Sequence, residues 1–286
     1  MKRGLIIFLM VFVCNTLLAN LEPGKKVVYK EVDGVKLSLH IFFPEKHKKK
    51  DKTPTIVFFH GGGWKGGGVV SFYNQSSYLA SRGMIAISVQ YRTEKPHGTT
   101  PVECVKDAKS AMRWIRSHAA SYGIDPERLV AGGGSAGGHL AAATAVIDGF
   151  NEEGEDTTVS CKPKALVLFN PVANNGPKGY GYTRVKAYWE SFSPYHNLNK
   201  NTPPTLIMLG TKDKLFTPKM AKSYKQKMEE NGTRCDLILY KGYDHAFFNL
   251  GISEAMHYQT MEDADVFLTS LGYLNGKSTV SEFKNR

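Results

Sequence analysis

Cysteine is scarce in this sequence: it accounts for 4 of 286 residues, of which Cys104, Cys161 and Cys235 lie beyond the first twenty positions. That odd number leaves at least one free thiol, so the chain is not a small domain held together by disulfides. No repeat with a period of roughly 20 to 50 residues occurs, which excludes solenoids and propellers. Neither an H-E-x-x-H motif nor a pair of C-x-x-C motifs is present, and we therefore predict no metal site.

Long hydrophobic runs are also missing, apart from Leu5–Val13 at the N-terminus. Lys2 and Arg3 precede this run and the small Ala19 follows it, which is typical of a secretory signal peptide. The run is shorter than the roughly 20 residues that cross a membrane, and no later segment offers a span. We predict a signal peptide at 1–20, a secreted or periplasmic protein, and no stable membrane association. An uncleaved N-terminal anchor is the alternative.

Acidic residues are outnumbered, because 37 Lys and Arg against 26 Asp and Glu give a formal net charge of +11. Part of the excess is a lysine-rich run at 46–52, which is typical of a solvated loop; an acidic polysaccharide as partner is the alternative. No nucleic-acid partner is predicted, and the oligomeric state stays open. The length and the 42% hydrophobic content suit one large α/β domain, which we place at 21–286.

Short apolar runs rich in β-branched residues alternate with helical periodicity along the chain. Strands alternating with helices indicate a mostly parallel sheet covered on both faces. Residues 172–201 break this alternation and are rich in Gly and Tyr, so we predict a small irregular cap there. The predicted strands are 35–43, 55–59, 84–89, 129–131, 165–169, 205–209 and 237–240, and the predicted helices are 101–118, 138–147, 219–230 and 256–271.

A G-x-S-x-G motif occupies 133–137, between a predicted strand and an alanine-rich helix. In that setting the motif is a nucleophile elbow, and its serine is Ser135. Glycines are needed because the serine stands on a strained turn where flanking side chains would meet neighbouring backbone. The helix N-terminus behind the turn also stabilises negative charge that develops on a substrate.

The remaining parts of a hydrolytic site lie beyond the ends of other predicted strands. The loop H-G-G-G-W at 60–64 can direct backbone N–H groups at an oxyanion, and we assign this role to Gly61, Gly62 and Ala136. His60 is expected to brace the loop by hydrogen bonding.

Asp213 and His245 complete a Ser, Asp, His order, each residue following a strand. We predict that His245 takes the proton of Ser135 and that Asp213 fixes the histidine tautomer. Asp244 adjoins the base in sequence and is expected to point elsewhere.

These motifs make the chain resemble the α/β-hydrolase group of hormone-sensitive-lipase-like esterases. It is most similar to a branch of bacterial acetyl- and feruloyl-type carbohydrate esterases with an H-G-G-G-W loop. The resemblance covers roughly 27–271 and implies an eight-stranded sheet, no cofactor, and catalytic roles for Ser135, Asp213 and His245. It rests on His60–Trp64, Tyr91-Arg92, Asp125-Pro126, Gly134–His139, Asp213 and His245.

Two departures from that family bear on the substrate. Lipase-like relatives often carry Asp before the serine, where this chain has Gly134, and their Leu-Ala-Pro-Glu continuation is replaced by T-E-K-P at 93–96. Both changes favour carbohydrate esters over lipids. We expect hydrolysis of short-chain acyl esters, acetyl or similar, on plant or algal carbohydrates. Trp64 and Trp189 are candidates for stacking on sugar rings, with simple packing as the alternative.

A peptidase or amidase and a short-chain lipase of the same fold remain alternatives, because ester and amide cleavage share one tetrahedral intermediate. A nucleotide-binding protein is less consistent with the sequence. The G-x-G-x-x-G match at 61–66 lacks the acidic residue expected about 20 positions later, since none occurs between Asp51 and Glu94. A non-catalytic member of the fold would be expected to lack a triad residue, and none is missing.

Overall fold

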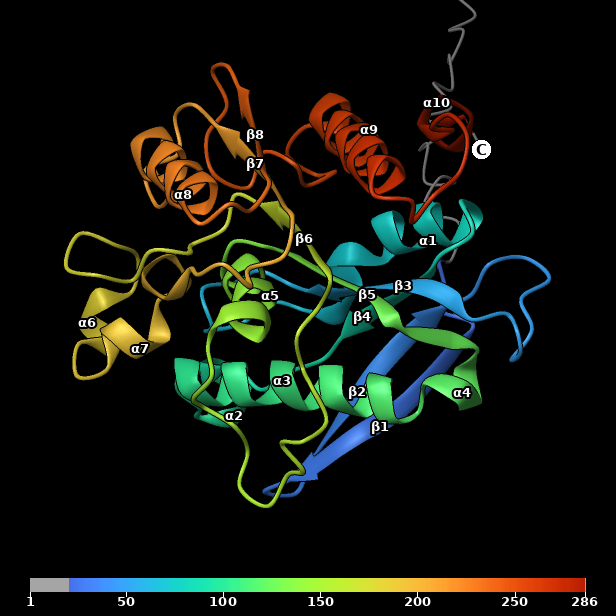
Figure 1. Ribbon diagram of the computed structural model, residues 1–286, viewed down its shortest axis with the longest axis horizontal. Helices are drawn as coiled ribbons and strands as arrows, with labels where there is room; N and C mark the ends of the chain where they lie inside the picture. Colours follow the sequence, from blue (N-terminus) through green and yellow to red (C-terminus); the bar gives the residue numbers. More distant parts are fainter. Residues whose placement is uncertain (1–20, 286) are drawn as a thin grey trace, which may run out of the picture.

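The computed structural model describes residues 21–285, so the predicted signal peptide lies outside the described part of the chain. Eight strands form one sheet in the order β1-β2-β4-β3-β5-β6-β7-β8 (Figure 1). β2 runs antiparallel to both of its neighbours, and the pairs from β4 to β8 are parallel. The mostly parallel eight-stranded sheet is therefore confirmed. The strands are β1 Lys25–Val32, β2 Val35–Phe42, β3 Thr53–Phe59, β4 Ile85–Val89, β5 Ile124–Gly134, β6 Ala165–Phe169, β7 Thr205–Gly210 and β8 Cys235–Tyr240.

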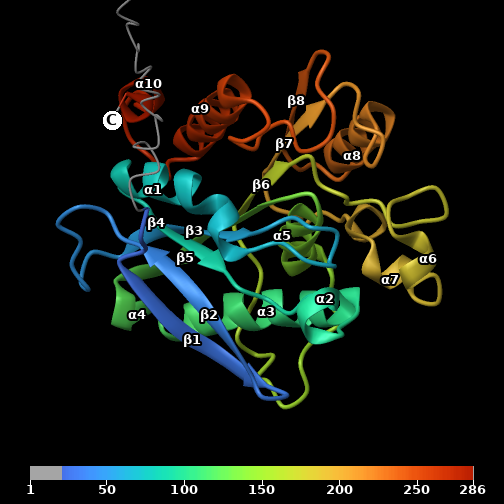
Figure 2. The ribbon, with the colours of Figure 1, turned by 180° about the vertical axis from the view of Figure 1, so that it is seen from behind.

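Helices cover both faces of the sheet (Figures 1 and 2). One face packs against α1 (Tyr73–Ser81), α9 (Glu254–Ser270) and α10 (Val280–Lys284). The other packs against α3 (Pro101–Ser117), α5 (Ala136–Val146) and α8 (Pro218–Glu230). The short remaining helices are η1 Val69–Phe72, α2 Glu94–His97, α4 Ala119–Tyr122, α6 Tyr182–Val185, α7 Trp189–Phe192 and η2 Pro194–Asn197.

The side chains of each strand alternate between the two faces of the sheet, so one sheet packs against two layers of helices. Along β3, the buried Val57 and Phe59 join the core on the α3 and α5 side, whereas Ile56 and Phe58 join the core on the α1 and α9 side. Successive side chains of a strand point to opposite faces. Each such apolar side chain stabilises the folded state by about 1.5 to 3 kcal/mol when it is buried. This two-sided burial holds rigid the strand ends that carry the site.

Several boundaries differ from the sequence-based predictions. β1 and α1 were not predicted, because Tyr29 is the only buried residue of β1 and the buried face of α1 includes the polar Gln75 and Ser76. The segment 172–201 forms α6, α7 and η2 beside α5, joined by irregular turns.

Cys104, Cys161 and Cys235 are buried free thiols. Within 21–285, no helix has both the length and the apolar character that a membrane crossing requires.

Candidate active site

Ser135 stands between β5 and α5 on a backbone with φ 54° and ψ −119°, a strained conformation for a residue with a side chain. Its N–H donates to the Phe169 carbonyl at 3.0 Å, which ties the turn to β6. Gly137 permits the helix to start so close to the sheet, since a Cβ there would lie 1.9 Å from the carbonyl oxygen of Phe59. The local sequence therefore builds the turn that the motif predicts.

The structure brings the three residues of the predicted triad together. Nε2 of His245 lies 2.8 Å from Oγ of Ser135, and Nδ1 of the same ring lies 2.7 Å from Oδ2 of Asp213. Asp213 is only 3% exposed, and its Oδ1 accepts the N–H groups of Leu215 and Phe216 at 2.8 and 3.1 Å. A carboxylate fixed in this way orients the imidazole so that Nε2 faces the serine.

Asp244 does not compete for the position of the acid. It is exposed, and its Oδ1 accepts the backbone N–H of His245 at 2.8 Å rather than contacting the ring. Asp236 and Asp265 form ion pairs with Arg234 and Arg82. The geometry thus leaves Asp213 as the partner of the base.

The glycine-rich loop lies directly against the elbow. A Cβ on Gly61 would lie 3.4 Å from Cβ of Ser135. Within 21–285, no protein oxygen accepts the backbone N–H of Gly61, Gly62 or Ala136. Free N–H donors beside a nucleophile are what an oxyanion hole requires.

His60 supports this loop from behind. Its Nδ1 lies 2.7 Å from the Gly61 carbonyl oxygen, and its ring stacks on Tyr91, whose hydroxyl donates to the His60 carbonyl at 2.6 Å. Burial lowers the pKa of His60 to about 4, so the ring is neutral near pH 7 and its Nδ1–H can donate to Gly61.

Ser135 and His245 line a cavity of about 440 Å³. The wall residues that sequence reasoning did not identify include Phe72, Asn170, Tyr180 and Phe248. Asn170 follows a predicted strand end and Phe248 follows the catalytic histidine by three positions, and such proximity was a signal available in the sequence. Phe72 and Tyr180 come from segments whose positions only the fold determines.

The predicted sugar contact of Trp64 is wrong. The side chain is 1% exposed, because its ring packs edge-on against His139 and Phe192 and the guanidinium of Arg184 covers it at 4.9 Å. No ligand can stack on a face that is already occupied. Trp189 is half-buried but does not line the catalytic cavity, so the structure does not bring it to Ser135.

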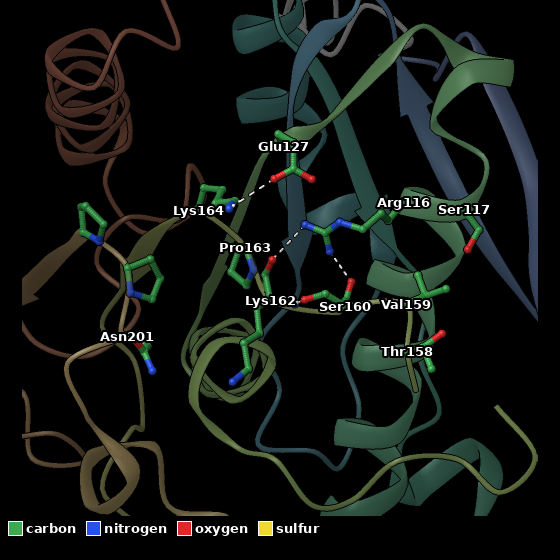
Figure 3. Close-up of a pocket in the computed structure, with 12 residues that line it drawn as sticks. Arg116, Ser117, Glu127, Thr158, Val159, Ser160, Lys162, Pro163, Lys164 and Asn201 are labelled. Carbon is green, nitrogen blue, oxygen red and sulfur yellow. Dashed lines mark hydrogen bonds and ion pairs between the residues drawn. The ribbon is translucent and has the colours of Figure 1, made fainter. Parts of the chain in front are cut away.

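A larger cavity, of about 780 Å³, lies at the opposite, amino-terminal ends of β5, β6 and β7 (Figure 3). Its charged groups are already paired: Lys164 lies 3.3 Å from Glu127, and Arg116 donates to the carbonyls of Ser160 and Lys162. None of the triad residues lines it. The chemistry therefore belongs to the smaller cavity at the carboxyl ends of the strands.

Fold and site together define an α/β-hydrolase of the esterase class. Esterase 2 of Thermogutta terrifontis, in its apo form, is similar in structure, with a TM-score of 0.86 and 39% identity over 91% of this chain and 99% of that one. Structures of the same esterase with propionate and with butyrate bound give TM-scores of 0.85 at 38% identity.

The chain belongs to the BD-FAE family, whose model matches residues 39–228. An acetylxylan esterase of Xylanibacter ruminicola is 25% identical over 95% of this chain. The probable isoprenylcysteine alpha-carbonyl methylesterase ICMEL1 of Arabidopsis thaliana is 26% identical over 77% of this chain. The chain spans about half the length of these curated relatives, 55% of the first and 50% of the second.

Proposed function

We propose that this protein is a secreted serine carboxylesterase that removes short acyl groups, acetyl or similar, from carbohydrate esters. The observation that carries the proposal is the continuous contact from Ser135 through His245 to Asp213, at 2.8 and 2.7 Å, beside backbone N–H groups that have no protein acceptor within 21–285. Nucleophile, base and acid thus form one hydrogen-bonded chain, and the oxyanion donor Gly61 lies beside the serine.

In the proposed reaction, Oγ of Ser135 attacks the ester carbonyl carbon while its proton passes to Nε2 of His245. The carbonyl oxygen becomes an oxyanion, which the N–H groups of Gly61, Gly62 and Ala136 bind. Collapse of this intermediate breaks the bond to the alcohol oxygen, which takes the proton from Nε2. A water molecule then attacks the acyl-enzyme by the same path and regenerates the free serine.

The apolar wall of the cavity supports a short acyl group. A Cβ at Gly134 would lie 2.4 Å from Cζ of Phe248, so the phenyl ring occupies the space beside the elbow where a side chain would stand. This ring packs on Phe72 and Phe169 at centroid distances of 5.9 and 4.9 Å and is 5% exposed. A wall of packed rings leaves little depth for additional methylenes. Propionate and butyrate, bound in the structures of the Thermogutta esterase, are acyl groups of the expected size.

The polar wall of the same cavity supports a hydroxylated alcohol. Ser71, Asn170 and Tyr180 line it and carry hydrogen-bonding groups of the kind that sugar hydroxyls match. The similarity to an acetylxylan esterase points to the same class of alcohol. Secretion is proposed on the pattern of residues 1–20 and agrees with an extracellular polymer as the source of the ester.

The decisive test compares Ser135→Ala with the wild-type protein on p-nitrophenyl acetate. The variant should lose about 10³-fold or more of the turnover, because no other nucleophile stands on the elbow. A folded variant that keeps a tenth of the activity would contradict the assignment.

A series of p-nitrophenyl esters from two to ten carbons, run beside acetylated and feruloylated sugars, then tests the substrate class. Each methylene that finds an apolar pocket adds about 0.8 kcal/mol, or roughly fourfold in kcat/KM. We expect the highest kcat/KM at two to four carbons, whereas a maximum at eight or ten would favour a lipase-like enzyme. N-terminal sequencing of protein recovered from culture medium tests the signal peptide, with a start near Asn20 or Leu21 as the expected result.

A further inference from the structure

Asn170, directly after β6, carries a side chain that the mechanism above does not use. Its backbone has a positive φ of 34°, a conformation that asparagine tolerates better than most residues, and its N–H donates to the Met208 carbonyl at 2.7 Å. The residue is buried, yet its side chain lines the catalytic cavity. A strained, buried polar residue at the wall of an active site suggests a functional constraint.

Two contacts fix which end of the amide faces the base. The Ala246 N–H donates to Oδ1 of Asn170 at 3.2 Å, and Nδ2 lies 3.3 Å from Nε2 of His245. The reverse orientation would set the amide hydrogens against the Ala246 N–H, two donors without an acceptor. The Nδ2 donors therefore point at the nitrogen through which the protons of the reaction pass.

These donors have no acceptor of their own in the resting site. A neutral His245 whose Nδ1–H donates to Asp213 offers one lone pair at Nε2, and the Ser135 hydroxyl lies closer to it, at 2.8 Å. Among residues 21–285, Nδ2 of Asn170 contacts no other acceptor. An oxygen atom bound beside Nε2 would serve as the acceptor for this donor. A bound substrate or water molecule provides such an oxygen.

We propose that Asn170 is a further catalytic residue whose Nδ2–H donates to the oxygen that exchanges a proton with His245. In acylation, the ester C–O bond breaks, the alcohol oxygen keeps the electron pair and takes the proton from Nε2, and Asn170 stabilises its developing negative charge. In deacylation, a water oxygen accepts a hydrogen bond from Nδ2–H, gives a proton to Nε2 and attacks the acyl carbon. Oγ of Ser135 then leaves with the electron pair and regains the proton.

Esters whose leaving groups differ in basicity distinguish a catalytic role of Asn170 from a structural one. This test rests on the proposed ester hydrolysis. The alkoxide of ethyl acetate needs charge stabilisation, whereas p-nitrophenolate leaves readily without it. Asn170→Asp keeps the acceptor for the Ala246 N–H, and Asn170→Gly keeps the positive φ. We expect both variants to lower kcat/KM about 10- to 100-fold for ethyl acetate, and less than about 3-fold for p-nitrophenyl acetate.

Asn249 provides the matched control, because it lines the same cavity while its Nδ2 already donates to the Ala246 carbonyl at 2.8 Å. Asn249→Gly should change kcat/KM for both esters by one common factor. The Asn170 variants should also accumulate acetyl-enzyme, seen as a larger burst of p-nitrophenolate. Equal losses on both esters in folded Asn170 variants, or no loss, would overturn the inference. A wild-type protein inactive on both esters would instead refute the proposed function.

Discussion

His139, at the start of α5, should make the protein sensitive to mild acid. Its ring is fully buried, stacked on Phe192 at 4.5 Å and edge-on to Trp64 at 5.0 Å. Its Nε2 lies 3.1 Å from the Phe192 carbonyl oxygen. Burial lowers the pKa of His139 from 6.5 to about 3, against the opposing effect of that hydrogen bond. The folded protein therefore keeps this histidine neutral where the unfolded chain protonates it.

The sign and size of the effect follow from proton linkage. Between about pH 3 and pH 6.5 the unfolded state binds a proton that the folded state does not, so the free energy of unfolding falls as the pH falls below 6.5. At pH 5 the unfolded pKa lies about 1.5 units above the pH, which amounts to about 2 kcal/mol. His60, with its pKa lowered to about 4 by burial, adds a similar amount. Together the two histidines lower the free energy of unfolding at pH 5 by about 4 kcal/mol, a large part of the 5 to 15 kcal/mol typical of a folded domain.

Replacing His139 with Phe keeps an aromatic ring in the slot and removes the titrating group. Urea unfolding at pH 7, 6 and 5, followed by tryptophan fluorescence, measures the result. At pH 7 the variant should be less stable by about 1 kcal/mol, because the Phe192 carbonyl loses a donor. At pH 5 this deficit should vanish or reverse by about 1 kcal/mol. The same substitution at exposed His118 is the control for loss of a histidine, and a wild-type-minus-variant difference that stays constant from pH 7 to 5 would refute the reasoning.

Three further predictions concern catalysis. Asp213→Asn should lower kcat by about 10³- to 10⁴-fold while Asp244→Asn costs little, and the reverse ranking in folded variants would move the role of the acid. Arg184 donates to the Gly63 carbonyl at 2.7 Å, so Arg184→Met should loosen the oxyanion loop and lower kcat about 10-fold; an unchanged kcat would count against this link. Phe248→Leu should raise kcat/KM for butyrate or hexanoate esters relative to acetate, by up to about fourfold per methylene accommodated, and an unaltered chain-length profile would show that the ring does not limit acyl size.

The sheet and the triad could be predicted because each depends on local sequence. A buried parallel strand is a short apolar run wherever it occurs, and the nucleophile elbow needs its glycines within two positions of Ser135. Asp213 and His245 follow the ends of later strands, and the carboxyl ends of parallel strands converge at one edge of the sheet. Their positions in the sequence therefore place them near Ser135. β1 escaped prediction because, with Tyr29 its only buried residue, it carries little apolar signal. In β5 the strand begins at Ile124, ahead of the apolar run at 129–131, because pairing with Thr53 extends it.

The walls of the cavity could not be predicted, because each contact joins segments that are distant in sequence. An aromatic residue beside an oxyanion loop suits stacking on a sugar, and nothing local to Trp64 shows that Arg184 and His139 already cover its ring. Whether such a residue binds ligand or fills the core depends on which segment packs over it. Here Arg184 of α6 and Phe192 of α7 pack against Trp64, so its ring belongs to the core.

Gly134 shows how a local departure from a motif acquires a meaning only in three dimensions. In the sequence it is an absence, a missing Asp before the nucleophile. In the structure the vacant position is filled by the ring of Phe248, which comes from beyond the catalytic histidine and would meet any Cβ at 2.4 Å. The two residues are therefore coupled, because a side chain at 134 requires the ring to move. Because a displaced ring would open the apolar wall between Phe72 and the elbow, we expect the residue before the serine to affect acyl-chain preference, although its own side chain is a single hydrogen.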